Sequence, residues 1–132
     1  METQIKEKIE RPIGYENEYR DCTVRALAVV SDLPYSEVHK AWEEVGRKDG
    51  HAPKNFENQH KLQKACKILN LEAKQVKRHG TVKNFIIKYP TGNYFCIKRG
   101  HAFAIINGKV FDLNNLNSYL QGAWLINKGV AQ

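Results

Sequence analysis

The segment that most constrains the fold is residues 22–31, because apolar side chains occupy nearly every position of a predicted helix. Asp21 stands directly before the run as its expected N-cap, and no Gly or Pro interrupts it until SDLP. Its apolar residues include Val24, Ala26, Leu27, Ala28, Val29 and Val30. A helix that is apolar nearly all round is a buried one. We therefore expect this helix to lie inside the protein, covered by other elements.

Two further helices are predicted to pack beside it. Over about 36–45 the apolar side chains recur three and four positions apart, with Ser36 as the expected cap and Gly46 after the last turn. A similar apolar stripe runs over about 56–69, and Asn70 can close that helix. The first half of the chain therefore reads as helical.

Beyond residue 70 the pattern changes to that of strands. Strand-like segments cover 71–77, 93–99, 101–108, 109–113 and 123–127. A short helix, capped by Thr81 and stopped before Pro90, interrupts them. This order predicts an α+β fold, with N-terminal helices packed on a mainly antiparallel C-terminal sheet. No repeat or linker divides the 132 residues, so we expect one domain over 1–132, with 1–13 as an irregular lead-in.

Composition excludes several classes of protein. No apolar run reaches the roughly 18 residues of a membrane span, and the N-terminus lacks the apolar stretch of a signal peptide. We therefore expect no membrane association and a cytoplasmic location. Cys22, Cys66 and Cys96 cannot all pair and show no C-x-x-C spacing, so free thiols are expected rather than a disulfide scaffold or a zinc site. No metal or cofactor is implied.

The net charge of +7 is unevenly distributed. Residues 61–88 contain eight Lys or Arg against a single acid, Glu72. A basic zone of this kind can bind nucleic acid or an acidic protein, with Tyr89 and Tyr94 as stacking candidates. It can also be only a solvated face. We favour this interpretation because no zinc-finger, helix-turn-helix or RNA-recognition signature accompanies the basic zone.

Cys22 occupies a position that favours chemistry. At the first turn of a helix its sulfur lies near unpaired N–H groups and the positive end of the helix dipole. Both stabilise the thiolate, which is the nucleophilic form of cysteine. The competing interpretation is a core cysteine, which is how we interpret Cys66 on the apolar stripe of the third helix.

A nucleophilic cysteine needs a base, and His101 is the candidate because it opens the apolar strand of GHAFAIINGKVFDLN. Asn107-Gly108 is a strong hairpin signal. In that register Asn114 lies opposite His101 and Asp112 lies diagonal to it, so either can orient the imidazole. We favour Asp112, because a carboxylate stabilises an imidazolium better than an amide does. The competing interpretation is an edge histidine beside a turn-end aspartate.

The other histidines are less suited to the role of base. They lie on the polar side of the second helix, beside the apolar stripe of the third, or in predicted loops: His39, His60, His51 and His79.

Three motifs together resemble a known family. DC at the start of a buried helix, then GHAFAI, then VFD is similar to the papain-like cysteine peptidase fold. The likeness is to its compact form in bacteriocin-processing peptidase domains and in small uncharacterised phage and bacterial proteins, and it covers most of residues 14–126. It implies that Cys22 is the nucleophile, His101 the base and Asp112 the residue that orients the base.

The chain departs from the family pattern at the oxyanion hole. Papain-like enzymes commonly carry a Gln about six residues before the cysteine as a donor to the oxyanion. Here Glu16 holds that position, and an ionised carboxylate cannot donate a hydrogen bond. Asn17 is adjacent and could serve together with the backbone N–H of Cys22.

These observations predict a thiol-dependent hydrolase of peptide or isopeptide bonds, phage-encoded and acting in the host cytoplasm. Its partner would be a protein or peptide substrate, including a host protein. The same residues also support acyl transfer. The alternatives are a catalytically degenerate papain-like accessory protein that binds a host protein, supported by Glu16, and a nucleic-acid-binding protein that uses the basic 61–88 zone.

Overall fold

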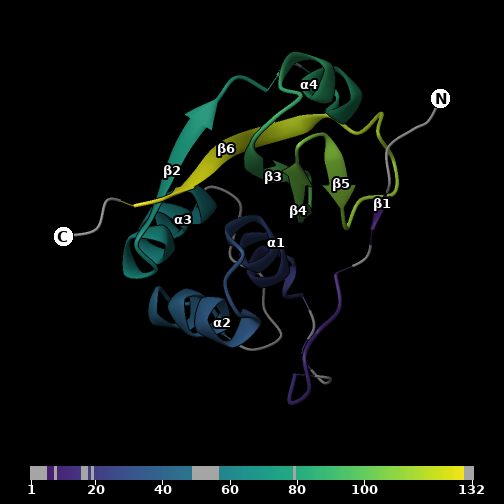
Figure 1. Cartoon of the computed structure of the whole chain (residues 1–132). Helices are drawn as coiled ribbons and strands as arrows, with labels where there is room; N and C mark the ends of the chain where they lie inside the picture. Colours follow the sequence, from purple (N-terminus) through teal and green to yellow (C-terminus); the bar gives the residue numbers. More distant parts are fainter. Residues whose placement is uncertain are drawn as a thin grey trace.

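A computed structural model of the chain describes residues 6–7, 9–15, 18, 20–48, 57–78 and 80–129. In this part of the chain four helices pack on a sheet (Figure 1). The helices are α1 (Cys22–Ser31), α2 (Tyr35–Glu44), α3 (Glu57–Ile68) and α4 (Val82–Lys88). The α+β class predicted from the order of helical and strand-like segments is confirmed.

The sheet has six strands in the described residues, in the order β1-β5-β4-β3-β6-β2. They are β1 (Lys6–Glu7), β2 (Leu71–Val76), β3 (Asn93–Lys98), β4 (His101–Ile106), β5 (Lys109–Phe111) and β6 (Leu120–Lys128). Strands β2 to β6 form an antiparallel sheet, and β1 adds to its edge parallel to β5. The short β1 lies in the N-terminal segment that we expected to be irregular.

Alternate residues along the strands pack against different helices. Phe95 and Ile97 of β3 face the core formed with α1, α2 and α3. Tyr94 and Cys96 of the same strand face a second core, formed with α4. This period of two is the normal consequence of strand geometry. The sheet therefore lies between three helices on one face and α4 on the other, as Figure 1 shows.

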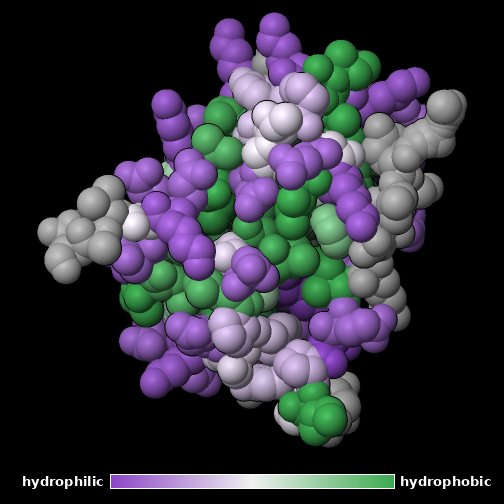
Figure 2. Space-filling model, viewed as in Figure 1, coloured by the Kyte–Doolittle hydropathy of each residue, from purple (hydrophilic) through white to green (hydrophobic). Residues whose placement is uncertain are grey.

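Helix α1 begins and ends where its apolar pattern predicts. Seven of its ten residues are buried, and it contacts both α2 and strands β3, β4 and β6. Figure 2 shows apolar side chains gathered near the centre of the viewed face, with hydrophilic ones around them. The burial of α1 fixes its N-terminus, and with it Cys22, against the start of β4.

The hairpin between β4 and β5 also follows the prediction. Asn107 and Gly108 both have positive φ, which a type I′ turn requires and which glycine adopts without a steric cost. Ile106 pairs with Lys109, and the ladder continues to Ala104 with Phe111. It ends there, because the next residue turns away from the sheet.

The predicted start of α2 was wrong. Ser36 does not cap the helix, which begins one residue earlier, at Tyr35, and has Pro34 at the N-cap position. The carbonyl of Pro34 accepts the N–H groups of Glu37 and Val38 at 3.1 and 3.2 Å. Because the ring of proline already fixes its φ, the chain is set for the first turn before Ser36 is reached.

Candidate active site

Cys22 and His101 meet where the start of α1 touches the start of β4. The Ala102 N–H donates to Cys22 Sγ at 3.4 Å, and Cys22 is partly exposed whereas Cys66 and Cys96 are buried. His101 is the first residue after the tight turn that joins β3 to β4, where it pairs with Lys98. Two segments about 80 residues apart in sequence are therefore brought into contact.

The hydrogen bond on His101 fixes its tautomer. Nε2 lies 2.6 Å from the backbone carbonyl oxygen of Asp112. A carbonyl oxygen can only accept, so Nε2 carries the proton of the neutral ring. The lone pair then stays on Nδ1, which is the form in which Nδ1 can receive the thiol proton of Cys22.

The two groups shift one another's pKa in opposite directions. Burial on its own raises the pKa of Cys22, but hydrogen bonds from His101 and from the Ala102 N–H outweigh it and lower the pKa below the ordinary value. The hydrogen bond with Cys22 is the main cause that raises the pKa of His101, against the effect of its burial. Both shifts favour a thiolate beside an imidazolium.

The other two thiols behave in the opposite way. Burial raises the pKa of Cys66 to about 12, and burial also raises the pKa of Cys96. In the described residues, no ionisable side chain lowers the pKa of either thiol. Cys22 is thus distinguished by its neighbours from two otherwise ordinary core cysteines.

Asp112 touches His101 through its backbone and not through its side chain, which corrects the predicted role of its carboxylate. The ladder ends before Asp112, which has a φ of 65°, so the diagonal geometry expected from the hairpin register is not formed. Its carboxylate instead accepts from the Ile9 N–H at 3.0 Å and pairs with Arg25. Asn114, the alternative, is exposed and lies beyond the end of the ladder.

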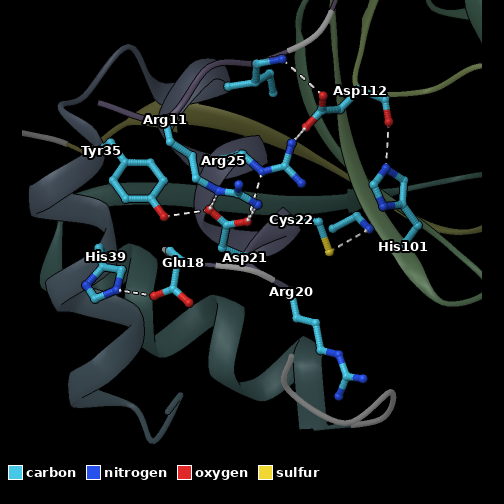
Figure 3. A network of polar contacts seen from close by, with 12 residues as sticks. Arg11, Glu18, Arg20, Asp21, Cys22, Arg25, Tyr35, His39, His101 and Asp112 are labelled. Atoms are coloured by element: carbon cyan, nitrogen blue, oxygen red, sulfur yellow. Dashed lines mark hydrogen bonds and ion pairs between the residues drawn. The ribbon is translucent and has the colours of Figure 1, made fainter. Parts of the chain in front are cut away.

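Arg25 connects Asp112 to Asp21, the residue before Cys22 (Figure 3). Its Nε donates to Asp21 Oδ1 at 3.1 Å, and its Nη1 donates to Asp112 Oδ2. Asp21 also accepts two hydrogen bonds from Arg11, at 2.8 and 2.9 Å, and one from the Tyr35 hydroxyl at 2.6 Å. Asp21 is fully buried, so its charge is balanced within the protein.

Asp21 therefore stands at the N-cap position of α1 without capping it through its side chain. Burial by itself would raise the pKa of this carboxyl, but the hydrogen bonds from Arg11 and Tyr35 and the charge of Arg25 hold it well below its usual range. The predicted cap was half right: the position is correct, but the carboxylate binds other side chains instead of the helix N–H groups.

A second buried ionic group lies beside this network. Glu18 accepts from Arg47 at 3.1 and 3.2 Å and contacts His39 Nε2 at 2.8 Å. His39 is 8% exposed and packs against the rings of Tyr15 and Tyr35. The prediction that His39 lies on the polar side of its helix was wrong, because the periodicity of α2 does not show the N-terminal residues that cover it.

Sequence reasoning missed most of this network. The spacing of Asp21 and Arg25 is a readable signal, since residues four apart on a helix are neighbours. Arg11 and Glu18 carry no such signal, because their partners are set by how the N-terminal segment crosses the helices. Asn17, the oxyanion-hole candidate, lies outside the described residues, as does Glu16.

The basic 61–88 zone does not lie on one element. Three of its lysines are on α3, one is on β2 and two are on α4, and α3 and α4 cover opposite faces of the sheet. The remaining two are in the connection after β2: Lys77 and Arg78. Their charge is therefore spread around the molecule instead of lining a single groove.

In the described part of the chain, no three His, Cys, Asp or Glu side chains come together as metal ligands. No helix in that part is long and apolar enough to cross a membrane. Comparisons with protein-family models, curated proteins and solved structures gave no match to the chain.

Proposed function

We propose that this protein is a thiol-dependent hydrolase of peptide or isopeptide bonds, with Cys22 as nucleophile and His101 as base. The observation that carries the proposal is the hydrogen bond from His101 Nε2 to the Asp112 carbonyl, next to a thiol of lowered pKa. That bond leaves Nδ1 basic at the side of the thiol, which is what activation of a cysteine requires.

The reaction follows from these positions. Cys22 Sγ forms a bond to the substrate carbonyl carbon while its proton passes to His101 Nδ1. The oxyanion faces the N-terminus of α1, where the Cys22 N–H is among the helix donors without an intrahelical partner. Collapse breaks the C–N bond, and the imidazolium protonates the leaving amine. Water, deprotonated by His101, then hydrolyses the thioester and restores the thiol.

We further propose that the fold is the compact papain-like one. The support is the chain order of Cys, His and Asp, the nucleophile at the start of a buried helix and the base at the start of a strand. The resemblance of DC, GHAFAI and VFD to that family adds to this. A protein or peptide, including one from a host cell, is the corresponding substrate.

The first test is selective alkylation. At neutral pH iodoacetamide should modify Cys22 much faster than Cys66 or Cys96, by about a hundredfold or more, because only its neighbours favour the thiolate. Modification is located by mass spectrometry of the folded protein. Equal rates at the three positions would contradict the proposal and leave Cys22 as a core cysteine.

The second test is turnover. The wild-type protein is incubated with a mixture of proteome-derived peptides, and new N-termini are identified by mass spectrometry. Cys22→Ala is the matched control, since its loss is one sulfur atom. Products that depend on Cys22 support a hydrolase. Selective alkylation without such products would instead favour the degenerate, binding-only alternative.

A further inference from the structure

Arg25 is placed to act on the site without touching the reacting atoms. It lies one turn into α1, three residues after Cys22, and is 15% exposed. One edge of its guanidinium binds Asp21, directly before the nucleophile, and another nitrogen binds Asp112. A planar group with several fixed donors can span two carboxylates in this way.

Asp112 needs such a contact to hold its conformation. Its φ of 65° lies in the left-handed region, which a non-glycine residue occupies at a cost unless its surroundings hold it there. Both carboxylate oxygens are engaged: Oδ1 with the Ile9 N–H and Oδ2 with Arg25. With the side chain held, the carbonyl of the same residue points at His101 Nε2, as Figure 3 shows.

We propose that Arg25 is a positioning residue: by binding the Asp112 carboxylate it aims the Asp112 carbonyl at His101, and so keeps the basic nitrogen of His101 toward Cys22. This inference rests on the proposed function. The roles of Cys22 and His101 do not explain why Arg25 links Asp21 to Asp112. A positioning role for Arg25 does explain this link. Because Arg25 is on α1 and Asp112 directly follows β5, the correct tautomer of His101 then depends on how α1 is placed relative to β5.

The test uses the pH profile of Cys22 alkylation and the ¹⁵N signals of the His101 ring, which report the tautomer. In Arg25→Gln we expect alkylation at about pH 6 to slow by about tenfold, equivalent to a midpoint about one pH unit higher. The His101 ring should at the same time lose its single Nε2–H form. A wild-type profile with a wild-type tautomer would overturn the proposal.

Arg11→Gln is the matched control, because Arg11 binds the same Asp21 carboxylate and is not among the groups that bind Asp112 in the described residues. It should keep both the alkylation profile and the tautomer. If Arg11→Gln moved them as far as Arg25→Gln does, the effect would be a general loosening around Asp21, and the proposal would be wrong.

Asp112→Asn covers the case in which Arg25→Gln does not fold. Its carbonyl and its side-chain volume are retained while the charge that binds Arg25 is removed. Loss of the Nε2–H tautomer in Asp112→Asn supports the proposal, and its retention overturns it. A wild-type protein whose Cys22 shows no enhanced reactivity would instead contradict the proposed function, so the two failures are distinguishable.

Discussion

At the scale of single residues, the three cysteines of this chain differ in their neighbours, and so in the direction in which the pKa of each thiol is shifted. Cys22 is partly buried and Cys66 and Cys96 are buried, and burial favours the neutral thiol at each position. At Cys22 the imidazole of His101 and the N–H of Ala102 reverse this effect. His101 is therefore the residue whose removal should change the chemistry of Cys22 most.

In His101→Ala the alkylation rate of Cys22 at about pH 6 should fall by about a hundredfold. The reason is that the thiol loses the hydrogen bond that most strongly counteracts the effect of burial on its pKa. The sign follows from the pKa shifts: His101 lowers the pKa of Cys22, so without it the thiolate forms only at higher pH. The measurement is the rate of alkylation against pH. A profile unchanged from wild type would show that His101 does not act on the sulfur.

Asn114→Ala tests the alternative orienting residue. The Asp112 carbonyl already occupies Nε2 of His101, so this change should leave the alkylation profile within about twofold of wild type. A loss as large as in His101→Ala would show that Asn114 orients the base after all.

At the scale of elements, the ion pairs at the start of α1 anchor the helix in its place. Asp21 binds an arginine from the N-terminal segment, an arginine of α1 and a tyrosine of α2. Removing one partner of a buried ionic group leaves the others uncompensated, which is costly. The stability of this junction should therefore depend on the charge of one carboxyl.

Asp21→Asn should lower the free energy of unfolding by about 3–5 kcal/mol at neutral pH. Because the folded pKa of Asp21 is below its ordinary value of 3.8, the stabilisation is fully present above that value and is lost as the pH falls toward the folded pKa. Urea unfolding of both proteins between about pH 3 and 7 measures the difference. A difference that grew on acidification would contradict this account.

In α2, apolar packing contributes to the stability of the fold in place of ion pairs. Trp42 is fully buried in the core that α1, α2 and α3 form with the sheet, where its ring stacks on that of Phe95. Trp42→Ala should therefore cost about 3–5 kcal/mol of unfolding free energy. Cys22→Ala should stay near wild type in the same urea experiment, because little more than a partly exposed sulfur is removed. Reversed costs would mean that Cys22 is structural and that α2 is peripheral.

The elements themselves were largely readable from the sequence. The apolar run of α1 and the Asn107-Gly108 turn are local signals, so their boundaries and register could be predicted. The start of α2 could not be placed by Ser36, since Pro34 had already fixed the backbone. The role of Asp112 was missed because pairing rules assume regular strands, whereas this residue leaves the sheet at a positive φ.

At the scale of the whole molecule, the candidate site is assembled from three separate stretches of chain. The N-terminal segment supplies Ile9 and Arg11, α1 supplies Cys22, and β4 with the residue after β5 supplies His101 and the Asp112 carbonyl. The sequence identified the second and third stretches, which carry motifs. In the first stretch it pointed to Asn17 and Glu16, which lie outside the described residues. The contacts of Ile9 and Arg11, which the structure describes there, carried no sequence signal.

This arrangement predicts that the N-terminal segment tunes the site without being needed for the fold. Deleting residues 1–10 removes β1 and the Ile9 N–H that holds Asp112 but leaves Arg11 and the antiparallel sheet. We expect a folded protein that loses about 1–2 kcal/mol of unfolding free energy, the scale of a few lost hydrogen bonds. Cys22 alkylation at about pH 6 should slow by about threefold, because Arg25 alone then restrains Asp112.

Deletion of residues 1–5 is the control for that experiment, since it leaves both β1 and Ile9. Both shortened chains carry an acetylated N-terminus, so that no new amine adds charge near Asp112. Equal alkylation profiles in the two would mean that Arg25 is sufficient to hold Asp112. A slower profile in the longer deletion alone, with the His101 tautomer partly lost, would show that Asp112 must be held from both sides, because one contact leaves its backbone free to leave the left-handed region.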